Sequence, residues 1–278
     1  MKNILVPCDF SDPAMQAFKF ASEVASLSKG EIFLLNIVEV PTLHNSMFVP
    51  VQANEDAFVK EWRRKAGNLF EKMKDKWARN AKVHLVVEQG SVTNTINKFV
   101  NRKGIDLIVM GTHGSSGFRE FAVGSNTEKI VRLSRVPVIA VRLAPKVASI
   151  KDIIFPTHLD LESKELITSV KALQNFLKAK LHILYVNTPA NFAKDISTEK
   201  RLNDFAKKNV LKNYTINVQN DIDVESGIIN FSSRFRNRMI AMSTHGRKGL
   251  SHLLSGSIAE DTVNHIQCPI WTYADLKK

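Results

Sequence analysis

The residues most suited to chemistry in this sequence are glycines that follow a short apolar run. Residues 111–129 read GTHGSSGFREFAVGSNTEK, directly after IDLIVM. Gly111, Gly114 and Gly124 let backbone N–H groups approach an anion without a Cβ in the way. Gly124 and Ser125 also precede a helical stretch, whose amino end carries unpaired N–H groups and partial positive charge. The spacing therefore predicts a cradle for phosphate groups.

The same glycine spacing occurs a second time in the chain. Residues 243–261 read STHGRKGLSHLLSGSIAED after NRMIAM, so that Gly246, Gly256 and Ser257 repeat in register. Neither block has the Gly-Lys-Ser/Thr of a P-loop, and no Gly-x-Gly-x-x-Gly turn follows the first strand. One glycine turn between a strand and a helix is more often structural than functional, but its repetition in the same strand context favours a ligand.

The repeat extends over the size of a domain. NILVPCDFSD, near the start, corresponds to DIIFPTHLDL later in the chain when Pro7 is aligned with Pro156. The first copy carries an insert at 39–56 that is rich in Pro and Asn, and 143–149 is the expected linker. We therefore predict two domains, at 1–145 and 150–278.

Each copy alternates apolar strands with amphipathic helices. In the first copy we expect strands at 3–7, 31–38, 82–88, 105–110 and 136–142, and helices at 12–28, 55–80, 93–103 and 125–134. In the second we expect strands at 152–156, 180–186, 215–219, 238–242 and 269–273, and helices at 163–179, 197–212, 225–235 and 257–266. The first helix shows one apolar stripe, made of Ala14, Ala17, Phe18, Ala21, Val24 and Ala25. Continuous apolar strands that alternate with helices predict an α/β fold with two tandem doubly wound parallel sheets.

Composition limits the function classes. The chain has 278 residues, 44% of them hydrophobic, a net charge of +12 and two cysteines, Cys8 and Cys268. No apolar run is long enough to span a membrane and the start does not resemble a signal peptide, so we expect a cytoplasmic protein with buried free thiols. The densest basic stretch, 60–82, mixes both charges at helical spacing, which favours a solvated helix face over a nucleic-acid surface. Trp62 and Trp77 within it fit packing better than stacking on a base.

These motifs together resemble the universal stress protein family, as a member with two tandem domains. The resemblance lies in VPCDFSD, LLNIV, VMGTHGSSG, GSNTEKIVR and VPVIAVR, and it covers nearly the whole chain. It implies a Rossmann-like, adenine nucleotide alpha-hydrolase-like fold in each domain and the binding of ATP or AMP at the glycine loops. It also implies that the last strands, VIAVR and PIWTY, pair within the chain as an internal pseudo-dimer, since an unpaired edge strand seeks a partner.

The resemblance assigns nucleotide-binding roles to residues of the first copy. The matching positions are Pro7, Asp9, Ile37, Met110, Gly111, Gly114, Gly124, Ser125 and Asn126. In the family, the position of Asp9 contacts the ribose or base side of the nucleotide, and that of Ile37 contacts the adenine. Asp9 could also help to hold a Mg²⁺ ion.

The second copy departs from this pattern. Its corresponding positions are Pro156, His158, Val186, Ser243, Gly246, Gly256 and Ser257. His158 replaces the carboxylate of Asp9, and Ser243 replaces Gly111. A charge-assisted hydrogen bond is worth about 1.5–3 kcal/mol, so we expect the second site to bind nucleotide weakly or not at all. His113 and His245 have no further metal ligands at suitable spacing, and loop packing explains them better.

Three functions remain open on this reading. The first is a regulatory nucleotide-binding protein of the stress response that signals through a protein partner of unknown identity. The second is a slow ATPase or phosphotransferase, although no general base and no acidic pair for Mg²⁺ stands out. The third is a ligand-free interaction or nucleic-acid-binding protein, which rests only on the basic charge. A homodimer is also compatible with the sequence.

Overall fold

We describe the protein from a computed structural model. The described residues are 1–39, 51–78, 81–112, 125–157, 159, 162–192, 195–243 and 268–274. Contacts divide the chain into two compact units, Met1–Gly111 and Thr112–Lys278. Each unit is described by itself.

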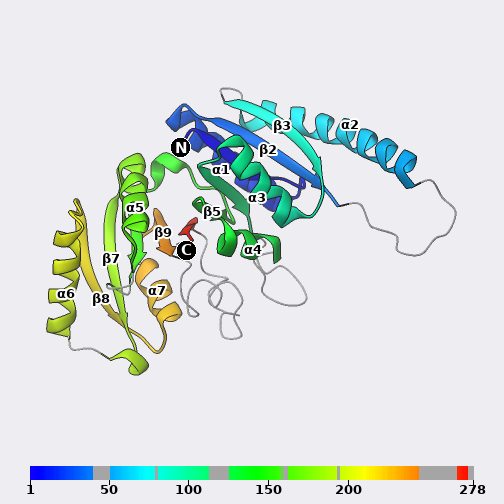
Figure 1. Cartoon of the computed structure of the whole chain (residues 1–278). Coiled ribbons are helices and arrows are strands. Elements are labelled where there is room, and N and C mark those ends of the chain that lie inside the picture. Colours follow the sequence, from blue (N-terminus) through cyan, green and yellow to red (C-terminus); the bar gives the residue numbers. More distant parts are fainter. Residues whose placement is uncertain are drawn as a thin grey trace. The chain divides into compact units, whose positions relative to one another are not determined.

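The first unit is a parallel sheet with helices between its strands (Figure 1). In chain order it contains β1 (Asn3–Pro7), α1 (Asp12–Ser28), β2 (Glu31–Val38), α2 (Val51–Trp77), β3 (Lys82–Gln89), α3 (Val92–Lys103) and β4 (Leu107–Gly111). The strands lie in the order β3-β2-β1-β4. Consecutive residues of β1 and β2 are buried, because side chains on both faces of the sheet are covered. The order reverses at β1, so β1 and β4 form the point at which open α/β sheets bind ligands.

Helix α1 shows why the local sequence folds as predicted. Ser11 caps the helix by accepting a hydrogen bond from the backbone N–H of Ala14, and Pro13 occupies the first turn, where its missing N–H is not needed. All six residues of the predicted apolar stripe are buried, which confirms the stripe. The helix ends at Ser28 and is followed by the C-cap residue Lys29, whose φ of 52° is left-handed.

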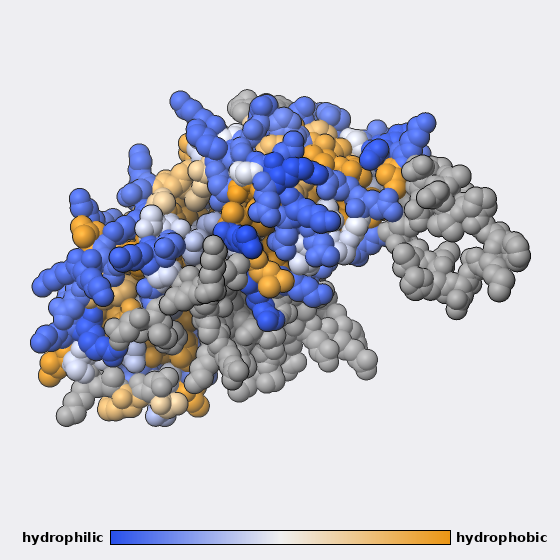
Figure 2. Space-filling model, in the orientation of Figure 1, coloured by the Kyte–Doolittle hydropathy of each residue, from blue (hydrophilic) through white to orange (hydrophobic). Residues whose placement is uncertain are grey.

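Helix α2 carries the densest basic stretch as a solvated face. Ala66, Phe70 and Met73 are buried, while the Lys, Arg and Glu side chains between them are mostly exposed. Arg64 pairs with Glu61 on this face at 2.7 Å. On the face that Figure 2 shows, hydrophilic residues cover much of the described surface, with smaller hydrophobic areas between them.

The second unit joins the last strand of the first copy to the strands of the second. It contains α4 (Ser125–Leu133), β5 (Val138–Val141), β6 (Asp152–Pro156), α5 (Lys164–Leu177), β7 (Lys180–Asn187), α6 (Asp195–Lys208), β8 (Tyr214–Asn220), α7 (Val224–Ser232), β9 (Arg238–Ser243) and β10 (Ile270–Tyr273), with short 3₁₀ turns at Val147–Ser149 and Pro189–Asn191. The strand order is β5-β10-β9-β6-β7-β8.

Strands β5 and β10 confirm the predicted pairing of the last strands. They are antiparallel, with Trp271 opposite Ile139, whereas β10 runs parallel to β9. Trp271 is fully buried at this junction, and the Thr272 hydroxyl donates to the Val138 carbonyl at 3.2 Å. The two copies are therefore joined within the chain by a β5–β10 ladder.

Most element bounds agree with the sequence to within a few residues, and the differences are local. Helix α7 ends at Ser232 rather than at 235, where the chain turns before β9. The expected linker contains a 3₁₀ turn in which Val147 is buried, so part of this segment is packed against the protein. The expected helix at 257–266 and most of the insert at 39–56 lie outside the described residues, and the domain boundary at 145–150 stays a prediction. None of the described helices is long and apolar enough to cross a membrane.

Candidate functional site

The predicted site residues of the first unit lie at the carboxyl ends of neighbouring strands. Pro7 ends β1 and Gly111 ends β4, with Met110 just before it, while Ile37 lies next to the end of β2. Because β2, β1 and β4 are adjacent and parallel, these ends meet at one edge of the sheet. Met110 is buried, and Ile37 is only half-buried, so part of its apolar surface is open at this edge.

Asp9 lies at the same edge, in the turn that joins β1 to α1. Its Oδ1 accepts a hydrogen bond from the backbone N–H of Ser11 at 3.0 Å, and Phe10 between them has a left-handed φ of 65°. Cys8 is buried below the turn, and burial raises the pKa of its thiol to about 12. The turn thus holds the exposed Asp9 carboxylate in place while leaving it accessible to a polar ligand.

Gly111 has a packing role that the sequence did not reveal. A Cβ at this position would lie 2.8 Å from the Ala14 backbone nitrogen and closer still to the Pro13 carbonyl group. The first turn of α1 therefore packs directly on the end of β4. Glycine is needed here for this contact, whether or not a ligand approaches.

An asparagine that sequence reasoning missed supports the Asp9 turn. Asn36 is buried in β2, and its Nδ2 donates to the Cys8 carbonyl at 2.8 Å. Trp62, from α2, donates its indole N–H to Asn36 Oδ1 at 2.6 Å. This chain of hydrogen bonds fixes the residue before Asp9. The available signal was a lone amide within the otherwise apolar run EIFLLNIV.

The second copy repeats the turn with different chemistry. Pro156 ends β6, and Leu159 has a left-handed φ of 67°, matching Phe10. Thr157 Oγ1 accepts from the Leu159 N–H at 2.9 Å and donates to Glu162 Oε1 at 3.1 Å. His158 lies outside the described residues.

Two further positions distinguish the second copy. Val186 is buried, and a Cβ at Gly227 of α7 would meet its Cγ2 at 3.1 Å and its Cγ1 closer still, so Val186 packs under that helix. Ser243 ends β9 at the position of Gly111. Helices α1 and α5 end at corresponding positions, because the C-cap residues Lys29 and Lys178 align and both have a left-handed backbone conformation. Helix α1 has 17 residues, however, and α5 has 14. Helix α5 thus lacks the residues that correspond to the first turn of α1, the turn that packs on Gly111.

Glu225, in the first turn of α7, is a second residue that sequence reasoning missed. Its Oε1 is buried and has no hydrogen-bond partner among the described residues. Burial, and to a smaller extent the nearby negative charge of Asp223, raises the pKa of this carboxyl from 4.5 to about 7. Ionised Glu225 is therefore an unfavourable group in the folded protein at neutral pH.

Because of Glu225, the free energy of unfolding should decrease as pH rises. Its pKa is higher in the folded state than in the unfolded state, so the folded state binds more protons between pH 4.5 and about 7, and the stabilisation is lost as pH rises through that window. After allowance for solvent screening, Glu225→Gln should raise the free energy of unfolding at pH 8 by about 1 kcal/mol and flatten this dependence. Urea unfolding at pH 5 and pH 8 measures both effects. Glu199→Gln, on the exposed face of α6, is the matched control; equal pH profiles for wild type and Glu225→Gln would contradict the assignment.

The remaining predicted residues are only partly described. Ser125 and Asn126 form the start of α4, in the second unit. The glycines and histidines of the two loops, Gly114, Gly124, Gly246, Gly256, His113 and His245, lie outside the described residues together with Ser257. Among the residues that the structure describes, no group of three or more His, Cys, Asp or Glu side chains could hold a metal ion. Cys268 is half-buried rather than buried.

Comparison with known proteins matches both copies. The model of the universal stress protein family matches residues 1–142 and 149–273. Universal stress protein MJ0531 of Methanocaldococcus jannaschii is 31% identical over 150 residues, which cover 52% of this chain and 84% of that protein. Universal stress protein YxiE of Bacillus subtilis is 28% identical over 144 residues, covering 50% of this chain and 97% of that protein. These relatives thus correspond to about half of this chain.

A solved structure matches the whole chain. The crystal structure of a universal stress protein from Archaeoglobus fulgidus superposes with a TM-score of 0.73 and covers 98% of both chains. The sequence identity is 16%, so this match establishes the fold alone. The family model, the relatives and the duplicated strand order lead to one conclusion: the chain belongs to the universal stress protein family, as a member with two tandem copies of the family's domain.

Proposed function

We propose that this chain binds an adenine nucleotide, ATP or AMP, at the carboxyl edge of β1, β2 and β4 and acts as a regulatory protein of the cytoplasmic stress response. The observation that carries the proposal is the exposed Asp9 carboxylate, held at the point where the strand order reverses. The resemblance of the glycine loops to those of nucleotide-binding family members supports the same ligand.

The ribose and the adenine of a nucleotide have candidate partners at this edge. The Asp9 carboxylate accepts hydrogen bonds, so it suits the hydroxyl groups of a ribose. The half-buried Ile37 offers apolar surface to the adenine ring. In the second unit, Ser125 begins α4, whose amino end presents N–H groups and partial positive charge that suit phosphate. Gly114 and Gly124 remain proposed parts of the phosphate cradle, and Asp9 could contact a Mg²⁺ ion carried by the phosphates.

A regulatory role fits this site better than rapid turnover. Asp9 is the only acid among the predicted site residues, and phosphoryl transfer needs a positioned base or water-orienting group together with metal ligands. We therefore propose that the bound nucleotide changes which partner the protein contacts. A ladder of buried strands, β5–β10, would keep the two copies together in every ligand state.

Removal of the Asp9 charge should weaken nucleotide binding. Asp9→Asn keeps the size of the side chain and one acceptor oxygen but loses the charge-assisted hydrogen bond, so we expect the Kd for ATP to rise about tenfold or more. Isothermal titration calorimetry on the full chain measures the change. Asp12→Asn, an exposed residue in the first turn of α1, removes an equal charge three positions away and should leave the Kd within about twofold.

The result can also reject the site. If Asp9→Asn and wild type bind ATP equally, Asp9 does not contact the nucleotide. If Asp12→Asn weakens binding as much as Asp9→Asn does, the effect is one of general charge rather than of a positioned carboxylate. Circular dichroism of both variants checks that the fold is retained.

We propose that the second copy contributes little to nucleotide binding. His158 stands where the first copy has Asp9, and Val186, in the position of Ile37, is buried under α7. Ser243 adds less to the argument for a weak second site, because the shorter α5 is a packing difference at the same strand end. The proposed asymmetry therefore rests on the missing carboxylate and the covered apolar position.

A further inference from the structure

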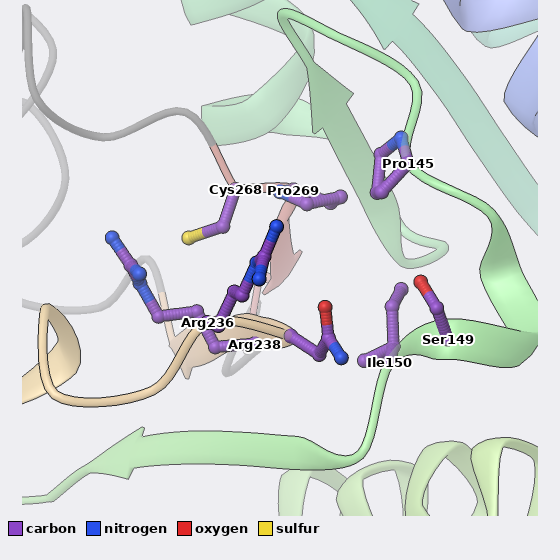
Figure 3. Close-up of a pocket in the computed structure, with 8 residues that line it drawn as sticks. Pro145, Ser149, Ile150, Arg236, Arg238, Cys268 and Pro269 are labelled. Carbon is purple, nitrogen blue, oxygen red and sulfur yellow. The ribbon is translucent and has the colours of Figure 1, made fainter.

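A cavity of about 250 Å³ lies in the second unit, beside the amino ends of β6 and β9. Ser149 and Ile150, just before β6, line one side, and the start of β9 lines the other (Figure 3). Asp152 and Arg238 are paired where these two parallel strands begin, so the cavity is at their amino ends. The candidate nucleotide site uses carboxyl ends, and the cavity is therefore a separate feature.

Two arginines give this cavity its charge. Arg236 and Arg238 rise from the same backbone segment in Figure 3, and none of the described residues that line the cavity is acidic. Among the described residues, neither guanidinium has an ion-pair partner. The carboxylate of Asp152, the register partner of Arg238, is paired with His182 instead. Two neighbouring cations that form no ion pair among the described residues favour the binding of an anion.

Arg238 is held in place with a spare donor. Its Nη1 donates to the Phe235 carbonyl at 2.6 Å, which fixes the guanidinium, while its Nε is buried and has no partner among the described residues. A buried donor without an acceptor is costly, and a bound oxyanion would satisfy it. Cys268, on the cavity wall, does not supply the missing charge, because the partial removal of its thiol from water raises the pKa of that thiol and keeps it neutral.

The size and donors of the cavity suit a phosphate group. Liquid water occupies roughly 30 Å³ per molecule, so a cavity of about 250 Å³ holds a ligand of several non-hydrogen atoms. Besides the two guanidinium groups, the Ser149 hydroxyl and the Asn237 amide can donate hydrogen bonds. A monovalent carboxylate would leave one arginine without a counter-charge, whereas a phosphate near its second ionisation balances both.

We propose that this cavity is a binding site for a phosphate group, either free or on a small phosphorylated metabolite, held by Arg236 and Arg238. The site is independent of the proposed nucleotide site.

The test is isothermal titration calorimetry of the full chain with inorganic phosphate at constant ionic strength. We expect saturable binding by the wild type and a Kd that rises about tenfold or more in Arg236→Gln and in Arg238→Gln. Arg234→Gln is the matched control, because Arg234 is exposed, donates to Gln219 and does not line the cavity. Arg236 is also exposed, so its replacement keeps the test valid even if Arg238→Gln disturbs folding.

Further titrations identify the source of the phosphate and the outcomes that reject the site. Tighter binding of methyl phosphate than of inorganic phosphate would indicate a phosphorylated metabolite, and the reverse would indicate the free ion. The proposal is overturned if the wild type shows no saturable phosphate binding, if Arg236→Gln binds as the wild type does, or if acetate binds as tightly as phosphate.

Discussion

Replacement of Trp271 by alanine should lower the free energy of unfolding by about 3–5 kcal/mol, one of the two largest effects that we expect from a single substitution. Trp271 is fully buried in β10, between Ile139 of β5 and Ala241 of β9. Loss of the indole leaves a cavity in the ladder that joins the two copies, where the backbone cannot collapse without breaking strand pairing. Urea unfolding followed by circular dichroism measures the loss.

Trp271→Phe separates packing from the indole N–H. The Trp271 Nε1 atom is buried and has no partner among the described residues, so its removal abolishes an unsatisfied donor while most of the ring volume stays. We expect this variant to lose less than about 1.5 kcal/mol. If Trp271→Phe were as damaging as Trp271→Ala, the volume of the ring would not carry the effect, and the packing account of the β5–β10 junction would be wrong.

Gly111→Ala should destabilise the protein by about 3 kcal/mol or more. The added Cβ would lie 2.8 Å from the Ala14 nitrogen and closer still to the Pro13 carbonyl group, distances that real Cβ atoms essentially never show. Both contacts are with backbone, so no side-chain rotation relieves them. The first turn of α1 must move away from β4, and it carries the Ser11 cap and the Asp9 turn with it. We therefore expect lower stability together with weaker nucleotide binding.

Gly67→Ala is the matched control for this prediction. Gly67 lies within α2, and a Cβ there would meet nothing within 4 Å. Since glycine is a poor helix former, alanine at this position should stabilise the protein by about 0.5–1 kcal/mol. The same substitution is thus expected to act in opposite directions at the two sites. A Gly111→Ala protein as stable as the wild type would show that α1 does not press on β4 as described.

The sequence was sufficient to predict the helices and strands because periodicity and caps are local. The apolar stripe of α1 predicted this helix, and the buried strands were recognised as continuous apolar runs. The ladder between β5 and β10 was predicted from the resemblance and from the cost of an unpaired edge. The end of α7 was predicted less well, because no glycine or proline marks it in the sequence.

The candidate site was predicted only where its residues follow a strand directly. Asp9 belongs to this class, and the strand order places it at the edge where ligands bind. Asn36 and Trp62 were missed as partners because their hydrogen bond joins β2 to a helix beyond the insert, and only the tertiary structure brings them together. The packing of Glu225 was missed for the same reason.

The contrast between Gly111 and Ser243 coincides with a difference in packing between the two copies. Both end the corresponding strand, and the sequence analysis counted Ser243 among the departures of the second copy. The structure gives a reason without a ligand: α1 has 17 residues and its first turn packs on Gly111, whereas α5 has 14 residues and begins later. The glycine is therefore required where the first turn of α1 packs on the end of β4.

The most direct test of the proposed function is the number of adenine nucleotides bound per chain. Equilibrium dialysis of the full chain against radiolabelled ATP measures this number at saturation. The proposed asymmetry, with Asp9 in the first copy and His158 in the second, predicts about one nucleotide per chain, with affinity lost in Asp9→Asn. Two equivalent nucleotides per chain, or none at saturating ATP, would contradict it.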